Sequence, residues 1–250
     1  MVKENHLMTK ITFVPELGGI SQIDEILPKP MRNFIPDWWK HTPYKEGVST
    51  LTSQYEGNIK TCPSFIDYFK IGYVVPAWCD VILGYDKETE EWNTRSSNVV
   101  FNFHGGDPSQ TVEVMPYSFQ NKKALFAFKG ISPWRIITDP GYSIMVLPLF
   151  FNFNQDFSIV PGIIDTDIHH RVNPDIMYHS DEKEVEIKRG QPLYHLLPFK
   201  REEYSLDVTE GYDLDNATYK RLTGNDAQIE TLFRGHKAYM NLRKKNNLET

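Results

Sequence analysis

Several features that assign a function directly are missing from this sequence. Its 250 residues include only two cysteines, Cys62 and Cys79, too few for a disulfide framework or a cysteine-ligated zinc cluster. No stretch approaches the roughly 18 consecutive apolar residues of a membrane-spanning helix. The first residues contain no apolar core of a signal peptide. We therefore expect a cytoplasmic protein that has no contact with a membrane.

Recognisable catalytic signatures are lacking as well. Ser96, Ser97 and Ser143 do not lie in a G-x-S-x-G nucleophile elbow. The glycine pairs Gly18-Gly19 and Gly105-Gly106 have no lysine after them, so we expect turns there and not a phosphate-binding loop. The sequence thus gives no support for nucleophilic catalysis.

The charge balance is mildly acidic, and the apolar content is that of a folded protein. Twenty-seven Lys and Arg residues stand against 33 Asp and Glu residues, for a formal net charge of -6. Nucleic-acid coats and membrane-surface binders carry a basic excess, so we expect no nucleic-acid partner. The 40% hydrophobic and 13% aromatic content is ample for a core and excludes an intrinsically disordered chain.

Short β-rich runs separated by Gly, Pro and Asn dominate the middle of the chain. Short strands at close spacing indicate a sandwich or barrel and not a βαβ sheet. One earlier strand is predicted at Thr9–Val14. The other predicted strands are Tyr73–Leu83, Trp92–Phe103, Ala124–Lys129, Trp134–Thr138, Ser143–Leu147, Phe157–Ile164, Glu184–Lys188 and Leu193–Phe199.

Helices are predicted near both ends of the chain. One short helix begins at Pro36-Asp37, and a second follows Pro63 and Ser64. Residues 213–245 lack proline and carry an apolar stripe at helical spacing, which predicts a C-terminal helix packed on its own domain or on a partner subunit. The stripe comprises Ile229, Leu232, Phe233, His236, Tyr239, Met240 and Leu242. We divide the chain into a β-rich region at 1–130, a core at 131–205 and a helical tail at 206–250.

Three segments, Pro140–Pro148, Val160–Asp167 and Lys188–Leu197, resemble in order and spacing the core of dUTPase and dCTP deaminase proteins. The most specific match is Gly162–Asp167, which corresponds to the G-[VI]-I-D-x-D strand of that family. The resemblance implies a mainly β fold, a β-clip or dUTPase-like barrel, to which we add short N-terminal helices and a C-terminal helix.

The match also makes local predictions. Gly162 would allow a sharp turn, Ile163 and Ile164 would be buried, and Asp165 and Asp167 would share one face of the strand. An aspartate placed beside the core must be paired, since an unpaired buried charge costs several kcal/mol. Candidate partners are Arg135, Arg171 and His195.

The family's functional residues are only partly present. By resemblance, Asp165 matches the aspartate that orients a water and the sugar, and Asp167 matches the second aspartate. Ile168 replaces the tyrosine that backs the sugar, Leu149-Phe150 replace a phosphate-binding Arg-Ser pair, and His195 replaces a phosphate-binding glutamine. The glycine-rich C-terminal arm of the family is absent. The resemblance therefore predicts the fold, whereas most of the residues needed for the family's activity are missing.

Five residues are candidates for ligand binding, and three of them also suggest a metal site. Asp167, His169 and His195 would converge if their strands paired, and imidazole with carboxylate suits zinc or iron. His169 and His170 are adjacent in sequence and no H-E-x-x-H motif is present, so we expect a polar turn and no metal. The ligand-binding candidates are Asp165, Asp167, His169, Gln191 and His195.

Over its whole length the chain resembles a family of uncharacterised proteins of bacteria and of tailed phages of marine bacteria. The residues that carry this resemblance are Pro36–Trp39, Thr61–Asp67, Ser132–Ile136, Asp139–Ser143 and Gly162–Asp167. It implies a phage or bacterial source and transfers no activity.

Two functions follow as expectations. The first is a non-catalytic β-rich binding or assembly protein without a cofactor. It would form a homo-oligomer, as a trimer, and would have other virion proteins as partners, in the host cytoplasm or in the virion. The alternative is a nucleotide-processing enzyme, a pyrophosphohydrolase or deaminase, with Asp165 as the catalytic residue and Mg²⁺ at the phosphates.

Overall fold

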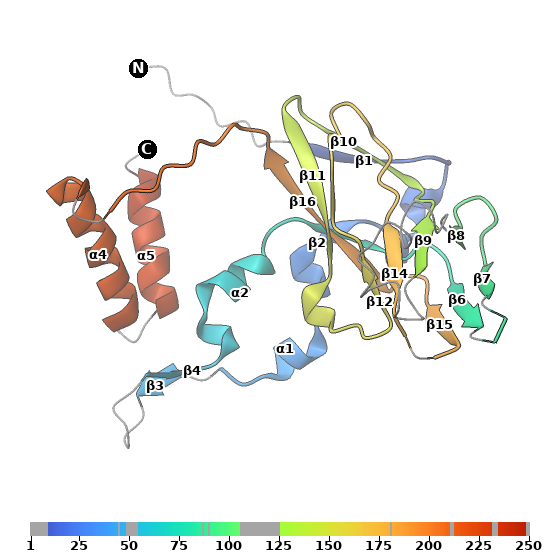
Figure 1. Ribbon diagram of the computed structural model, residues 1–250, viewed down its shortest axis with the longest axis horizontal. Coiled ribbons are helices and arrows are strands. Elements are labelled where there is room, and N and C mark those ends of the chain that lie inside the picture. Colours follow the sequence, from blue (N-terminus) through green and yellow to red (C-terminus); the bar gives the residue numbers. More distant parts are fainter. Residues whose placement is uncertain are drawn as a thin grey trace. The chain divides into compact units, whose positions relative to one another are not determined.

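The computed structural model describes residues 10–44, 46–48, 55–86, 88–89, 91–105, 126–180, 182–210, 213–231 and 235–248. The chain forms two compact units (Figure 1). Unit 1 consists of Met1–Phe34 and Gly72–Arg201, and unit 2 consists of Ile35–Ile71 and Glu202–Thr250. The ranges 1–130, 131–205 and 206–250 stay predictions. Parts of the predicted strands at 9–14 and 124–129, and Gly106, lie outside the described residues.

The largest sheet of unit 1 is antiparallel and has β16 at its centre. Its nine residues make β16 the longest strand, and it pairs with β11 on one side and with β5 on the other. β13 and β2 form the two edges of this sheet. The strands in spatial order are β13 (Gly162–Ile164), β11 (Tyr142–Pro148), β16 (Pro192–Lys200), β5 (Tyr73–Pro76) and β2 (Lys29–Pro30).

The described part of unit 1 also contains three smaller antiparallel sheets. The first contains β12 (Phe157–Ile159), β14 (Asp175–Tyr178), β9 (Phe126–Gly130) and β8 (Phe103–Gly105). The second contains β15 (Glu184–Ile187), β6 (Val81–Asp86) and β7 (Glu91–Ser96). The third contains β1 (Ile11–Pro15) and β10 (Trp134–Thr138). The prediction of a mainly β protein is thus confirmed.

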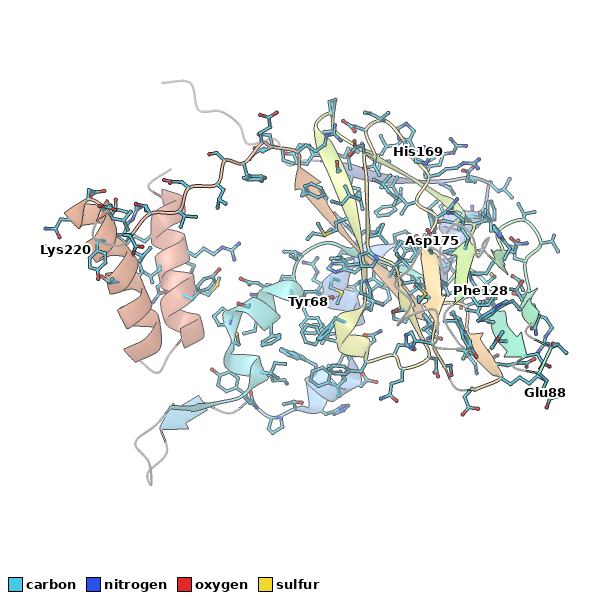
Figure 2. The ribbon with its side chains drawn as sticks, in the orientation of Figure 1. Tyr68, Glu88, Phe128, His169, Asp175 and Lys220 are labelled. Atoms are coloured by element: carbon cyan, nitrogen blue, oxygen red, sulfur yellow. The ribbon has the colours of Figure 1, made fainter. Side chains whose placement is uncertain are left out.

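Buried apolar residues alternate with exposed polar residues along the strands of unit 1, and the buried side chains form one hydrophobic core. In β15 the exposed glutamates alternate with the buried Val185 and Ile187, as a half-buried strand requires. Phe128 of β9 lies opposite Ile176 of β14. Figure 2 labels Phe128 and also Asp175, the residue of β14 that precedes Ile176. Strand β14 was not predicted from the sequence, because Asp175 is followed by three large apolar residues in a row and not by alternating polar and apolar ones.

The helical elements comprise four α-helices and several single turns of 3-10 helix in the described chain. The two predicted N-terminal helices are confirmed as α1 (Asp37–His41) and α2 (Pro63–Tyr68), and Pro63 opens α2. The short turns are η1 (Ile20–Gln22), η2 (Asp24–Ile26), η3 (Met31–Phe34), η4 (Ile59–Thr61) and η6 (Phe150–Asn152). Unit 2 also contains the hairpin of β3 (Glu46–Val48) and β4 (Tyr55–Gly57).

The prediction of a helical C-terminal region is confirmed, and this region contains two helices. Two helices, α4 (Asn216–Thr231) and α5 (Gly235–Leu248), contact each other. Helix α5 begins at Gly235, whereas Gly224 lies inside α4 in spite of the low helix propensity of glycine. Leu232 and Phe233 of the predicted stripe lie outside the described residues. No helix in the described ranges is long and apolar enough to cross a membrane.

Candidate functional site

The segment that resembles the dUTPase core forms β13 and the turn after it. β13 pairs with β11, with Ile164 opposite Ile144 and Ile163 opposite Met145. The strand then ends, because the backbone N–H groups of Ile168 and His169 both donate to the carbonyl of Asp165, at 2.9 and 2.7 Å. Asp165 and Asp167 therefore lie in a turn and not along a strand face.

Three local predictions for this segment are corrected by its edge position. Ile163 is 60% exposed, since an edge strand has no neighbour on its outer side. Ile164 is only half-buried, although it packs against the core. A Cβ atom added to Gly162 would meet no atom within 4 Å, so this glycine serves no close approach.

Arg201 brings the two aspartates together. It follows the last residue of β16, and its backbone N–H donates to the carbonyl of Gly141 at 2.8 Å. The guanidinium then donates to both carboxylate oxygens of Asp167, with Nη1–Oδ1 at 2.8 Å and Nη2–Oδ2 at 2.5 Å. This fork geometry is the strongest form of an arginine–carboxylate pair.

Asp165 completes what we call the Arg201 cluster: Arg201, Asp165, Asp167, Ser143 and the backbone of Gly141 and Tyr142. Nη1 of Arg201 lies 3.2 Å from Oδ1 of Asp165. The buried hydroxyl of Ser143 donates to that same Oδ1 at 2.6 Å and accepts from Nη1 at 3.0 Å. Nη1 also donates to the carbonyl of Tyr142 at 3.2 Å.

The cluster fixes the charge state of Asp167. Hydrogen bonds from Arg201, and then from the backbone N–H of Gly141 at 2.8 Å, lower the pKa of Asp167 to about 2. The same pair raises the pKa of Arg201. Asp167 is only 10% exposed, whereas the side chain of Asp165 is 48% exposed. The two carboxylates thus differ mainly in their access to solvent.

Buried threonines hold the turn beneath the cluster. Oγ1 of Thr138 donates to the carbonyl of Tyr142 at 3.1 Å and lies 2.9 Å from Oγ1 of Thr166. Because Thr138 has a single hydroxyl hydrogen, Thr166 is the donor in the second bond. Nδ1 of His170 lies 2.9 Å from the carbonyl of Thr166. A carbonyl only accepts, so Nδ1 carries the hydrogen.

The five candidate residues do not form one site within the chain. Asp165 and Asp167 meet at Arg201, and the exposed His169 (Figure 2) contributes its backbone N–H to the same turn. His195 is fully buried in β16, between Leu147 and Val74.

Gln191 lies at the other end of β16 from Arg201. Its Oε1 accepts from the backbone N–H of Lys188 at 3.2 Å. The nine residues of β16 span roughly 30 Å at about 3.3 Å per residue. In the described part of the chain, no group of three His, Cys, Asp or Glu residues is placed to hold a metal ion.

For two of the candidate partners of the aspartates, Arg135 and Arg171, the prediction was wrong. Arg135 and Arg171 pair instead with Glu16, with Nε–Oε1 distances of 2.9 and 3.4 Å. Sequence reasoning missed Arg201 and Ser143. The available signal was weak: Arg201 stands two residues after the last predicted strand, and Ser143 lies in the segment Pro140–Pro148. Only the pairing of β11 with β16 places them together.

Comparisons with known proteins concern the fold. No family model matches the sequence, and no curated protein is similar to it. The dUTPase of EIAV is similar in structure, with 11% identity, 58% of this chain and 88% of that chain covered, and a TM-score of 0.33. A dUTPase from phage phi11 of S. aureus has 13% identity, coverage of 67% and 95%, and a TM-score of 0.31. The Staphylococcus bacteriophage 80alpha dUTPase has 12% identity, coverage of 67% and 87%, and a TM-score of 0.30.

All three of these solved structures are dUTPases. TM-scores of 0.33 and below assign no activity and no residue role to this chain. The chemistry of the Arg201 cluster is therefore derived from its own contacts.

Proposed function

We propose that this protein is a non-catalytic, β-rich binding or assembly protein that works as a homo-oligomer. One observation carries the proposal: both carboxylates of the dUTPase-like motif are already bound inside the chain. Arg201 contacts Asp165 and Asp167, while Ser143 and Gly141 donate to one carboxylate each. The two aspartates of the motif thus connect the turn after β13 to the residue that follows β16.

The bound state of Asp167 makes it a poor proton acceptor. A general base works best when its pKa lies near the working pH, whereas the pKa of Asp167 is about 2. Two bonds from Arg201 and one from Gly141 also occupy its oxygens. Asp167 therefore orients the turn and is not available to activate a water.

The charge of the cluster also argues against a triphosphate ligand. One guanidinium faces two carboxylates, so the cluster has one negative charge in excess. Phosphoryl groups are bound by arginine, lysine or a metal ion with positive charge to spare. The only cation of the cluster is committed to the aspartates.

One specific observation supports the alternative, a nucleotide-processing enzyme. The side chain of Asp165 is 48% exposed, so it can still accept a hydrogen bond from a water or from a sugar hydroxyl. Under this alternative Mg²⁺ would have to supply the missing positive charge at the phosphates.

An activity assay separates the two functions. The protein is incubated with each deoxynucleoside triphosphate and Mg²⁺, and pyrophosphate and ammonia are measured. We expect no turnover. Turnover that Asp165→Asn abolishes would establish the enzyme and overturn the proposal. The matched control is Asp24→Asn, which removes a carboxylate that is 85% exposed and paired only with Lys29 in the described chain.

The assembly part of the proposal is supported by large apolar side chains on the surface. Val99, Ile168 and Leu206 are each more than two thirds exposed, at 89%, 74% and 89%. Single exposed apolar residues are common, but contacts between subunits need such side chains. We propose a trimer and, for a phage-encoded chain, other virion proteins as partners. Mass spectrometry of purified particles tests the virion role: the chain is expected among the particle proteins, and its absence would contradict that role.

A further inference from the structure

Two arginines lie directly opposite each other on the surface of unit 1. Arg135 belongs to β10, and an isolated antiparallel bridge pairs it with Arg171. The backbone N–H of Ile136 donates to the carbonyl of His170 at 2.8 Å, in agreement with this register. Side chains of directly opposed residues leave a sheet on the same face, with their Cβ atoms about 4.5–5.5 Å apart. The two arginine side chains are 42% and 54% exposed.

One carboxylate offsets these two positive charges. Like charges directly opposite each other are unfavourable in a sheet, and Glu16, only 18% exposed, lies between them and both guanidinium groups. Arg135 contacts both of its oxygens, with Nε–Oε1 at 2.9 Å and Nη2–Oε2 at 3.2 Å. Arg171 reaches the same Oε1 with Nε alone, at 3.4 Å. These three side chains, which we call the arginine pair site, carry one positive charge in excess.

Most of the donors of the arginine pair site are still available to a ligand. Each guanidinium has five N–H donors. In the described part of the chain, Nη1 of Arg135 and both Nη groups of Arg171 make no ion pair and no hydrogen bond. A carboxylate fits such a fork and supplies a single negative charge. A phosphate monoester carries about two negative charges at neutral pH, which is more than the excess here.

An exposed apolar side chain lies beside the arginine pair site. Ile137 is 40% exposed, and alternation along β10 places it on the same face as Arg135, with the buried Ile136 on the other face. Val14 of β1 is the neighbour of Arg135 on the side away from Arg171, and it is half-buried. A ligand with a carboxylate next to an apolar group would be complementary to this face.

We propose that this face of unit 1 binds an acidic segment of a partner protein. A glutamate or aspartate of the partner binds Arg171 and Arg135, and an apolar side chain next to it packs on Ile137. The inference rests on the proposed binding function and names the chemistry of the partner. Arginine is enriched in protein interfaces, and its planar fork holds a carboxylate in one orientation. A nucleic acid would be repelled by the rest of the chain, because the formal net charge is -6.

A pair of blocked pentapeptides tests the inference. One peptide has a glutamate between two leucines and a glycine at each end, and the other has a glutamine in place of the glutamate. Each is titrated at low salt into the full-length protein labelled with 15N in its arginines, and the Nε–Hε signals are followed by NMR. We expect the glutamate peptide to shift the signals of Arg135 and Arg171 and to bind about fivefold more tightly than the glutamine peptide, as an exposed ion pair allows. Equal affinities, or shifts at other arginines alone, would overturn the inference.

Two variants separate binding from a structural role of the site. Arg171→Gln should abolish the difference in affinity between the two peptides. Glu16→Gln should enlarge it, because both guanidinium groups then lack their internal carboxylate. A site that only stabilises the fold predicts the reverse for Glu16→Gln, and a smaller difference in this variant would overturn the proposal. Arg189→Gln is the control, since Arg189 pairs with Glu25 elsewhere on the surface, and it should keep the wild-type difference.

Other ligands are titrated at the same ionic strength. Inorganic phosphate or a short oligothymidylate that shifts the two arginine signals, when the glutamate peptide does not, would replace the acidic protein by a phosphate ligand and overturn the proposal. A wild-type protein that is monomeric and turns over a deoxynucleoside triphosphate would overturn the proposed function itself, whatever the peptides show. Failure of the peptides alone would leave the proposed function standing.

Discussion

Asp167 makes the stability of the protein depend on acid pH. Its pKa falls from 3.8 to about 2 in the folded chain, first because of Arg201 and then because of Gly141. A lowered pKa stabilises the fold fully above the ordinary value, and this contribution is lost as the pH falls from about 4 towards 2.

The prediction is that wild type loses more stability than Asp167→Asn on acidification through this range. Urea unfolding of both proteins at neutral pH and near pH 3 measures it. Asp167→Asn should be the less stable protein at neutral pH, and the gap should narrow in acid. A gap that is the same at both pH values would show that Arg201 does not stabilise the ionised Asp167.

Arg201 is predicted to need its planar fork and not only its charge. Lysine cannot donate to both oxygens of Asp167 in the same geometry and cannot reach Ser143 as well. Arg201→Lys should therefore lower the melting temperature by several degrees. Arg189→Lys is the control, because Arg189 pairs with Glu25 on the surface, where both side chains are nearly half exposed, and surface pairs contribute little. Equal melting temperatures for the two variants would contradict the role of the cluster.

At the scale of elements, three glycines in turns and edges should respond differently to alanine. Gly72 has φ +72°, and an added Cβ would overlap the carbonyl oxygen of Leu196 and Nε2 of His195. Gly141 has φ +84° but open space, and Gly162 has neither constraint. Unfolding measurements should show little change for Gly162→Ala, a loss of about 1–2 kcal/mol for Gly141→Ala and a larger loss for Gly72→Ala. A different order would contradict these backbone positions.

Helix α4 offers a change in the opposite direction. Gly224 lies inside this helix, and its Cβ would meet no atom within 4 Å. Gly224→Ala should therefore stabilise α4 by about 0.5–1 kcal/mol, since alanine loses less backbone entropy in a helix. Hydrogen exchange of the α4 amides, compared with wild type, measures the gain. Faster exchange in the variant would show that α4 is not continuous at Gly224.

The alternation of apolar and polar residues and the residues typical of helix starts predicted most of the strands and helices. They did not predict where each strand lies in its sheet. The buried strands β5, β11 and β16 are readable because Val, Ile and Leu recur between turn residues. Whether a strand lies at an edge depends on partners far away in sequence, so the exposure of Ile163 was not predictable from its own neighbours. The Arg201 cluster was not predicted for the same reason, because its residues are distant in sequence. Arg201 and Ser143 are separated by 58 positions and meet only through the β11–β16 register.

At the scale of the whole molecule, the proposal is that assembly, and not catalysis, is what the β-rich unit supports. The motif's carboxylates are bound by Arg201, and the large apolar side chains of Val99, Ile168 and Leu206 are exposed. The proposal has one consequence that can be measured directly: the molar mass of the protein in solution should exceed that of one chain.

Multi-angle light scattering of the purified wild-type protein at tens of micromolar measures that mass. We predict a single species at a small multiple of the 29.1 kDa chain mass, three chains for the proposed trimer, and the same mass with or without deoxynucleoside triphosphates. A stable species at 29.1 kDa over the whole concentration range would contradict the assembly function.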